Sequence, residues 1–326
     1  MNISRRTLLT AAAAAPFAAY AGRLSAATQL PIGIGVQTYS FRDMLQTPGD
    51  MVDKMIAGMK ALGLKSVELF EASIQPPALN EFAAWAVPPG GTATHASVYG
   101  APPLGKAPSK WDAESRAGIR RWRLDTPMSY FTDVRRRFNS AGIEIFAFNF
   151  AIRDADDEEL QRGFAMTHTL GTGIMTGSTT ISNARRIKPM VEKSGLIVGL
   201  HGHSNKENPD ELSTARSFET CLAMSPNYRV NLDLGHMTAV DADPIAFIRK
   251  HHARITNIHI KDRERHEGPN RPFGQGDTPI REVLQLLVRN RYAISVDLEY
   301  EYAGQEGSVR ELMKCVAYVR QAIVQA

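Results

Sequence analysis

The stretch VNLDLGHMTAVDADPIAFIRKHHARITNIHIKDR, residues 230–263, decides the fold. Apolar and polar residues alternate around it at 228–234 and 255–261, and this alternation is typical of strands. Between them, 243–252 has the spacing of an amphipathic helix. A strand, a helix and a second strand in this order predict two neighbouring parallel strands joined by a helical crossover.

The same alternation runs through most of the chain of 326 residues. Eight alternating strands and helices predict an α/β fold, a (β/α)8 TIM barrel formed as a single domain. The further strand candidates are 32–38, 65–70, 143–150, 172–177, 196–202 and 293–299. The further helix-like stretches are 47–62, 156–170, 181–194, 211–224 and 280–290.

Two segments do not follow this alternation. Pro and Gly clusters in 87–110 predict a long loop at the barrel mouth, and within it 92–98 is a weak ninth strand candidate built from small residues. The Arg-rich segment 116–137 predicts helices with a solvated basic face.

Residues 1–27, MNISRRTLLTAAAAAPFAAYAGRLSAA, have paired arginines, a modest apolar stretch and then small residues. This pattern resembles a twin-arginine (Tat) signal peptide and predicts a periplasmic protein, with the barrel in 28–326 and no stable membrane insertion after cleavage. Cleavage would remove three arginines and no acid, so the 38 lysines and arginines fall to 35 against 34 acidic residues. The nearly neutral mature chain argues against a nucleic-acid partner.

The two cysteines, Cys221 and Cys315, lie in helix-like segments. Substrates of the twin-arginine route usually fold before export, so we expect no structural disulfide. Two scattered thiols also exclude a cysteine-based zinc site.

The last four strand candidates place polar residues on one face near their carboxyl ends. In a barrel one face of each strand points inward, and active sites form at the carboxyl ends. Buried polar groups need partners, and a shared cation would supply one, although any single residue of this set is also compatible with an ordinary hydrogen-bonding role. Two imidazoles and two carboxylates suit Mn²⁺, Co²⁺, Fe²⁺ or Zn²⁺ better than Mg²⁺ or Ca²⁺. The predicted metal ligands, one for each strand, are His201, Asp233, His259 and Glu299.

Other residues near the strand ends are candidates for catalysis or substrate binding. Lys261 either acts on the substrate, by binding an oxygen or stabilising an enolate, or forms a salt bridge. The expected base is Glu299 or His203, and the alternative role of His203 is to orient His201. His236 and Arg263 are expected substrate contacts, while Glu71 either reaches the mouth as one or lies on the surface. The Gly-Gln-Gly at 274–276 is only a turn signal, and we expect no nucleotide cofactor.

These residues resemble the xylose-isomerase-like TIM barrels, the sugar isomerase/epimerase superfamily that also contains endonuclease-IV-type enzymes. The resemblance covers nearly the whole mature chain and is densest in 230–263 and in PFGQGDTPIREVLQLLVRNRYAISVDLEYEY, residues 272–302. IGVQTYSFRD, residues 34–43, is similar to the first strand of the family. In isomerases and epimerases of the family the ligands are Glu, Asp, His and Glu on strands five to eight, which implies the set given above. Barrels of this type often form homodimers.

His201 departs from the family pattern, since it stands where sugar epimerases have a glutamate that is both ligand and base. Two-base epimerisation needs an acid/base group on each face of the reacting carbon. The substitution and the export signal together favour a metal-dependent enzyme acting on a keto-sugar or glycoside, and above all a 3-keto-glycoside lyase. A sugar isomerase or epimerase is the alternative; a metal nuclease and a non-catalytic sugar-binding protein are weaker ones.

Overall fold

The computed structural model describes residues 32–79 and 113–325. Eight parallel strands close into a barrel in the order β1-β10-β7-β6-β5-β4-β3-β2. Each predicted strand is present, with ends that shift by a few residues. The strands are β1 (Ile34–Gln37), β2 (Ser66–Phe70), β3 (Glu144–Asn149), β4 (Ile174–Ser178), β5 (Ile197–His201), β6 (Tyr228–Asp233), β7 (Ile255–Ile260) and β10 (Ser295–Leu298).

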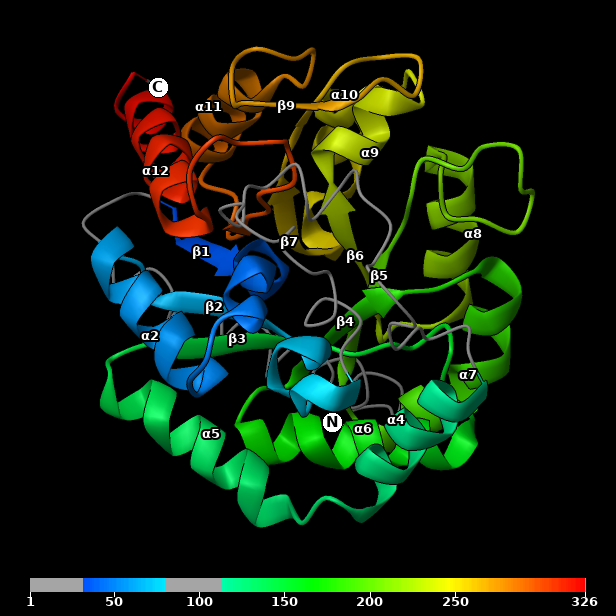
Figure 1. Ribbon diagram of the computed structural model, residues 1–326. Helices are drawn as coiled ribbons and strands as arrows, with labels where there is room; N and C mark the ends of the chain where they lie inside the picture. The colour runs from blue at the N-terminus through cyan, green and yellow to red at the C-terminus, as the bar shows by residue number, and fades with distance from the viewer. Residues whose placement is uncertain (1–31, 80–112, 326) are drawn as a thin grey trace, which may run out of the picture.

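Helices surround the barrel in Figure 1, and α2, α5, α6, α7 and α8 follow one another around its outside. The α-helices are α2 (Met51–Leu62), α4 (Ala113–Asp125), α5 (Met128–Ser140), α6 (Asp157–Leu170), α7 (Ile181–Ser194), α8 (Ala215–Met224), α9 (Leu234–Ala239), α10 (Pro244–His251), α11 (Ile280–Asn290) and α12 (Ser308–Val324). Short 3₁₀ turns are η1 (Thr38–Gln46), η2 (Glu71–Ile74), η3 (Pro77–Leu79) and η5 (His252–Arg254), and β8 (Asp262–Arg263) pairs with β9 (Asn270–Arg271).

Local signals in the sequence explain where the helices begin and end. At the start of α6, Asp156 accepts a hydrogen bond from the Glu159 amide, and the Glu159 side chain accepts one from the Asp156 amide. The helix ends at Gly171, whose φ of +85° is a left-handed conformation that glycine adopts without strain. The left-handed Gly171 reverses the chain after α6 and leads it into β4.

The barrel and its helices share one hydrophobic core. Val198 and Leu200 of β5 are fully buried in it, as are Leu232 of β6 and Ile258 of β7. The alternate residues of these strands, which the sequence assigns to the inward face, are the polar ones. The late strands therefore present polar side chains to the inside of the barrel and apolar side chains to the core outside it.

The segment predicted as helices with a basic face forms α4 and α5, but its face is not wholly solvated. Arg123 is only 3% exposed, because its guanidinium is paired with buried carboxylates. Cys221 and Cys315 lie in α8 and α12 as free thiols, as predicted. The predicted signal peptide at 1–27, the predicted loop at 87–110 and the strand candidate at 92–98 all lie outside the described residues.

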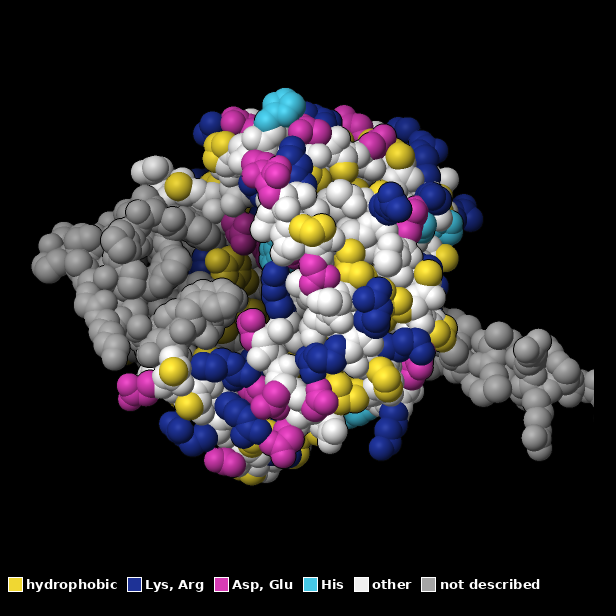
Figure 2. Space-filling view, turned by 90° about the vertical axis from the view of Figure 1, so that its right-hand side faces the viewer, with side chains coloured by type: hydrophobic (Ala, Val, Ile, Leu, Met, Phe, Trp, Pro, Cys, Tyr) yellow, Lys and Arg dark blue, Asp and Glu magenta, His cyan; other side chains and the backbone are white. Residues whose placement is uncertain are grey.

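Lysine, arginine, aspartate and glutamate are intermixed on the described part of the face in Figure 2, where no continuous basic stripe is visible. None of the helices among the described residues is both long enough and apolar enough to span a membrane.

Candidate active site

A cavity of about 560 Å³ collects side chains from the carboxyl ends of the strands. Its lining has two parts that come from different halves of the chain. The late strands and their loops supply His201, His203, His236, His259, Lys261, Glu299 and Glu301. The early strands, α4 and nearby turns supply Tyr39, Phe70, Glu71, Ala72, Leu79, Arg116, Ile119, Arg123, Phe150, Ala151 and Arg153, among others.

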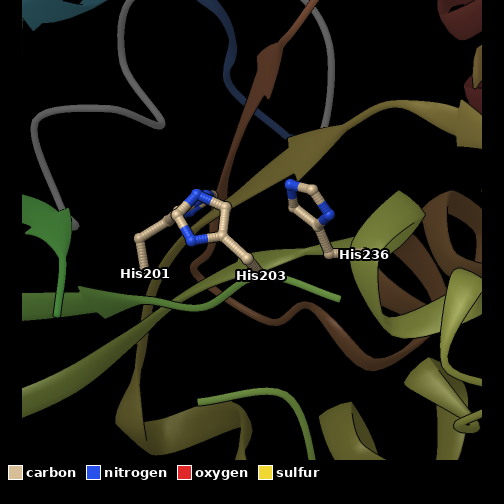
Figure 3. A group of neighbouring side chains, drawn as sticks. All are labelled: His201, His203 and His236. Atoms are coloured by element: carbon tan, nitrogen blue, oxygen red, sulfur yellow. The ribbon is translucent and has the colours of Figure 1, made fainter. Parts of the chain in front are cut away.

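Three imidazoles converge at the late end of the cavity (Figure 3). His201 ends β5, His203 follows it by two residues, and His236 lies in α9 directly after β6. The His203 ring centre is 5.0 Å from that of His201 and 5.1 Å from that of His236. Behind them, the ring of His259 lies 5.0 Å from that of His201. His201 and His203 thus belong to a larger cluster of imidazoles.

His201 is held as a neutral imidazole. Burial and the neighbouring histidines lower its pKa to about 4. Its Nδ1 lies 2.7 Å from Asn231 Oδ1, so Nδ1 carries the proton that donates this bond. Nε2 then keeps its lone pair, which is the state that a metal ligand requires.

His259 is held from the opposite side by a buried carboxylate. Its Nε2 donates to Glu68 Oε2 at 2.6 Å, and its Nδ1 lies 3.4 Å from Glu299 Oε2. Burial alone would lower the pKa of His259, but the two carboxylates outweigh burial and hold it well above the ordinary value. A metal bound at Nδ1 would displace the proton there.

Glu68 is a residue that the sequence analysis did not single out. It is fully buried in the middle of β2, and its two carboxylate oxygens accept hydrogen bonds from four strands. Burial alone would raise its pKa, but the charge and hydrogen bond of His259 lower it to about 2. Its alternation with Val67 and Leu69 is the sequence signal that places it inward. The donors are Asn149 (2.8 Å), Thr176 (2.5 Å), Asn231 (3.2 Å), Asn257 (2.5 Å) and His259 (2.6 Å).

Lys261 forms salt bridges, which is one of its two predicted roles. Its Nζ lies 2.8 Å from Asp233 Oδ2 and 2.9 Å from both Glu299 Oε2 and Glu301 Oε2. Burial would lower its pKa, but these three carboxylates raise it well above the ordinary value, so the group is an ammonium. Its ammonium still lines the cavity and remains within reach of a bound molecule.

Asp233 and Glu299 are therefore both in contact with a cation. Asp233 caps α9 by accepting from the His236 amide at 2.7 Å. Burial would raise the pKa of Asp233, but Lys261 and the nearby imidazoles lower it well below the ordinary value. Both carboxylates are thus ionised ligand candidates, and Glu301 is an additional one that the sequence analysis did not assign.

Two groups of side chains bring their ligand atoms close enough together to hold a metal ion. Ligand atoms of His201, Asp233 and His259, from three adjacent strands, all lie within 4.8 Å of one another. A second such group consists of His201, His203 and His236. Glu299, the fourth predicted ligand, is not in either group; its Oε2 lies 2.9 Å from Lys261 Nζ and 3.4 Å from His259 Nδ1. Imidazole and carboxylate donors at this spacing fit a divalent transition metal.

His236 and Arg263 form a pair at the rim. Arg263 Nη1 lies 3.0 Å from His236 Nδ1, and His236 Nε2 lies 3.2 Å from Lys261 Nζ. Burial and the charge of Lys261 lower the pKa of His236 well below the ordinary value, so the ring is neutral. His236 lines the cavity and Arg263 lies behind it, where it also bonds Ser204 Oγ and Gly268 O.

His203 is the most exposed of the clustered imidazoles, with 38% of its side chain accessible. Its Nδ1 lies 3.8 Å from Glu211 Oε1, and its Nε2 lies 3.4 Å from Ser178 Oγ. Burial would raise the pKa of Glu211, but His203 and Arg153 lower it. His203 therefore projects into the cavity with an ionised carboxylate nearby.

Two positions were predicted for Glu71, at the barrel mouth or on the surface. The structure places it at the mouth. It borders the cavity but is only 2% exposed, and both its oxygens accept hydrogen bonds of 2.7 Å from Arg123. Arg123 also contacts Glu159 at 3.0 Å. The contact depends on α4 packing near the end of β2, which no local pattern in the sequence reveals.

A closed parallel barrel with imidazoles and carboxylates at the carboxyl ends of its strands defines the TIM-barrel class with a mouth-side site. The family model described as "Xylose isomerase-like TIM barrel" matches residues 56–319, and the chain belongs to this family. A search of curated proteins returned no match.

Solved structures share the fold at low sequence identity. A probable 3-DHS dehydratase from Bacillus anthracis matches with a TM-score of 0.59 and 14% identity, over 89% of this chain and 99% of that one. The 3-keto-D-glucoside 4-epimerase from E. coli matches with a TM-score of 0.57 and 11% identity, over 89% and 99%. The IOLI protein, solved with a bound zinc atom, matches with a TM-score of 0.58 and 12% identity, over 90% and 99%. At these identities the likeness concerns the fold.

Proposed function

We propose that this protein is a periplasmic, divalent-metal-dependent lyase that removes the aglycone from 3-keto-glycosides by 1,2-elimination. The observation that carries the proposal is the charge balance of the late-strand cluster. Lys261 and the protonated His259 supply two positive charges, whereas four carboxylates face them. Those carboxylates belong to Glu68, Asp233, Glu299 and Glu301.

This surplus of two negative charges becomes three when His259 gives up its Nδ1 proton to a metal, and a divalent cation would offset most of it. His201, Asp233 and His259 would hold the ion, with Glu299 as the nearest further carboxylate. When bound, such an ion polarises a substrate carbonyl as a Lewis acid. Mn²⁺, Co²⁺ and Zn²⁺ suit these donors, and the fold relative solved with zinc supports the choice of a transition metal.

His203 is the base in this proposal. Its side chain is exposed to the cavity, whereas the Glu299 carboxylate is engaged by Lys261 and lies beside His259. The C2–H bond of a 3-keto-glycoside is acidic because it lies next to the C3 carbonyl. His203 would accept that proton, and Glu211 would stabilise the resulting imidazolium.

Lys261 would stabilise the negative charge that develops on the C3 oxygen of the substrate. As the C2–H bond breaks, its electron pair forms an enolate whose negative charge lies on the C3 oxygen, and an ammonium stabilises such an anion. The enolate then restores the C3 carbonyl, a C1=C2 double bond forms, and the C1–O bond breaks. The aglycone leaves as an alcohol after taking up one proton, so no oxidant or reductant is needed.

The position of His201 favours elimination over epimerisation. Epimerases of the family have a glutamate there that serves as one of two bases, while the neutral His201 is oriented by Asn231 as a ligand. The 3-keto-glucoside chemistry named for the E. coli fold relative gives a related substrate. An exported protein would meet glycosides oxidised in the periplasm.

Incubation of the purified protein with a 3-keto-glucoside and with free ketoses in D₂O tests the proposal. We expect metal-dependent release of the aglycone from the 3-keto-glucoside. Deuterium uptake into an intact ketose, without release, would instead assign the isomerase or epimerase alternative. Sugar binding that persists after chelation, with no turnover, would indicate a non-catalytic binding protein.

A further inference from the structure

The end of the cavity opposite the metal ligands has an apolar wall, and the arginines beside this wall are paired with carboxylates. β2 and β3 lie across the eight-stranded ring from β6 and β7. Side chains that follow β2 and β3, together with α4, form the wall there. Its apolar members are Phe70, Ala72, Leu79, Ile119, Phe150 and Ala151.

Each arginine of this wall is already neutralised. Arg123 bonds both oxygens of Glu71 and is 3% exposed. Arg116 pairs with Glu159, and Arg153 with Glu211 at 3.0 Å. A phosphate group favours a site with surplus positive charge, whereas each of these arginines is held by a carboxylate.

The ring surfaces at this end are held rigidly. Phe150 is fully buried from solvent, and the Arg123 guanidinium lies 4.7 Å above the centre of its ring. Phe70 packs edge-on against Tyr39, with 5.8 Å between ring centres. Ile119, only 9% exposed, projects from α4 into the same cavity. Preformed apolar walls of this kind favour an apolar ligand without a cost for ordering side chains.

We propose that this wall, formed by Phe70, Leu79 and Ile119 and backed by the buried Phe150, is a subsite for an apolar, ring-containing aglycone, while the sugar lies at the metal ligands. The assignment rests on the proposed lyase function. A cavity of about 560 Å³ falls within the roughly 300–1,000 Å³ of pockets that enclose drug-sized ligands, so it has room beyond a single sugar ring. A second sugar would need polar partners where these apolar side chains stand.

The test compares release from three 3-keto-β-glucosides: cyclohexyl, methyl and a glucosyl disaccharide. Cyclohexanol and methanol are alcohols of similar acidity, so a difference in kcat/KM between the first two reports binding of the aglycone rather than leaving-group chemistry. We expect the cyclohexyl compound to exceed both others by about tenfold or more. Equal values, or preference for the disaccharide, would overturn the apolar subsite.

Ile119→Thr replaces the ethyl group on the isoleucine Cβ with a hydroxyl at the wall. We expect it to reduce the cyclohexyl-to-methyl ratio of kcat/KM roughly tenfold. The matched control is Ile187→Thr, which makes the same change at a buried position of α7 that does not line the cavity. A ratio unaffected by Ile119→Thr, or lowered equally by the control, would contradict the assignment.

Calorimetric binding of the unoxidised cyclohexyl and methyl glucosides separates the two proposals. If neither 3-keto-glucoside is cleaved but the cyclohexyl glucoside still binds more tightly, and Ile119→Thr removes the difference, the lyase function fails and the subsite stands. If cleavage occurs and binding shows no such preference, the lyase function stands and the subsite fails.

Discussion

Both halves of the barrel mouth combine basic and acidic side chains, but the two halves differ in the balance of their charges. On the early half, Arg116 and Arg123 face Glu71 and Glu159, so two positive charges meet two negative ones. On the late half, Lys261 alone contacts three carboxylates. A balanced cluster stabilises the fold and is closed to further ions, whereas an unbalanced one has donors left for a cation. The number of charged residues therefore identifies a site less well than their imbalance.

The largest effect expected from this difference is on turnover. Chelation of the metal, or His201→Ala, should lower aglycone release by about 1,000-fold or more, because proton removal then lacks a Lewis acid. Added Zn²⁺, Mn²⁺ or Co²⁺ should restore the chelated wild type but not the variant. Metal analysis alongside turnover makes the measurement, with His168→Ala, an exposed histidine of α6, as control. Full activity in metal-free protein would refute the metal site.

Replacing a positively charged side chain in each cluster compares the two halves directly. Lys261→Met should bind a divalent ion about tenfold more tightly, because Asp233 no longer shares its carboxylate, yet turnover should fall about 100-fold. Arg123→Met should leave metal affinity unchanged but lower the free energy of unfolding by roughly 3–5 kcal/mol, since it leaves buried carboxylates unpaired. Metal titration and urea unfolding of both variants provide the comparison. Equal metal affinities in the two variants would remove the distinction between the clusters.

Glu68 tests whether the late cluster depends on support from an early strand. Glu68→Gln replaces a carboxylate that accepts from His259 Nε2, so the tautomer that presents Nδ1 is no longer favoured. We expect metal affinity to fall about 10–100-fold, measured by competition with a chelator of known affinity.

The matched control is Asp297→Asn, another buried carboxyl that bonds Asn257 at 2.8 Å and contacts neither His201 nor His259 by a hydrogen bond. Burial and the charge of Glu68 raise the pKa of Asp297 to about 7, so the amide resembles its protonated form. Equal losses of metal affinity in the two variants would show that Glu68 acts only through general packing.

The barrel itself could be predicted from the sequence because each strand and helix has its own local signal. Alternation placed the strands, and the polar ends of the last four indicated the site. His201, Asp233 and His259 meet because adjacent parallel strands bring their carboxyl ends together, which is a property of the fold.

What the sequence could not supply is the pairing between distant elements. Glu68 alternates with apolar residues as Glu299 does, but it lies in the middle of its strand. A buried charge at such a position is costly unless other groups compensate for it. Its five donors come from other strands and compensate for that burial. Likewise, the contact of Lys261 with three carboxylates depends on side-chain conformation. The pairing of Arg123 with Glu71 depends on how α4 packs.

The smallest expected effect concerns the acid stability of the early half. Glu159 accepts from Arg123 Nη1 at 3.0 Å and from the Asp156 amide at 2.9 Å. Burial would raise its pKa, but Arg116, the Asp156 amide and Arg123 lower it below the ordinary 4.5. The unfolded chain therefore binds more protons here, so the stabilisation is fully present above about pH 4.5 and is lost as the pH falls through the folded pKa.

Glu159→Gln should accordingly be less stable than the wild type by about 2 kcal/mol at pH 7, and this difference should shrink toward pH 3. Urea unfolding of both proteins at a series of pH values measures it, and the difference between them isolates Glu159 from the other carboxylates. Metal affinity at pH 7 should be unchanged, because the carboxylate serves only the balanced cluster. A difference that does not vary with pH would mean that the Glu159 charge contributes nothing, and altered metal affinity would mean that the two halves are coupled.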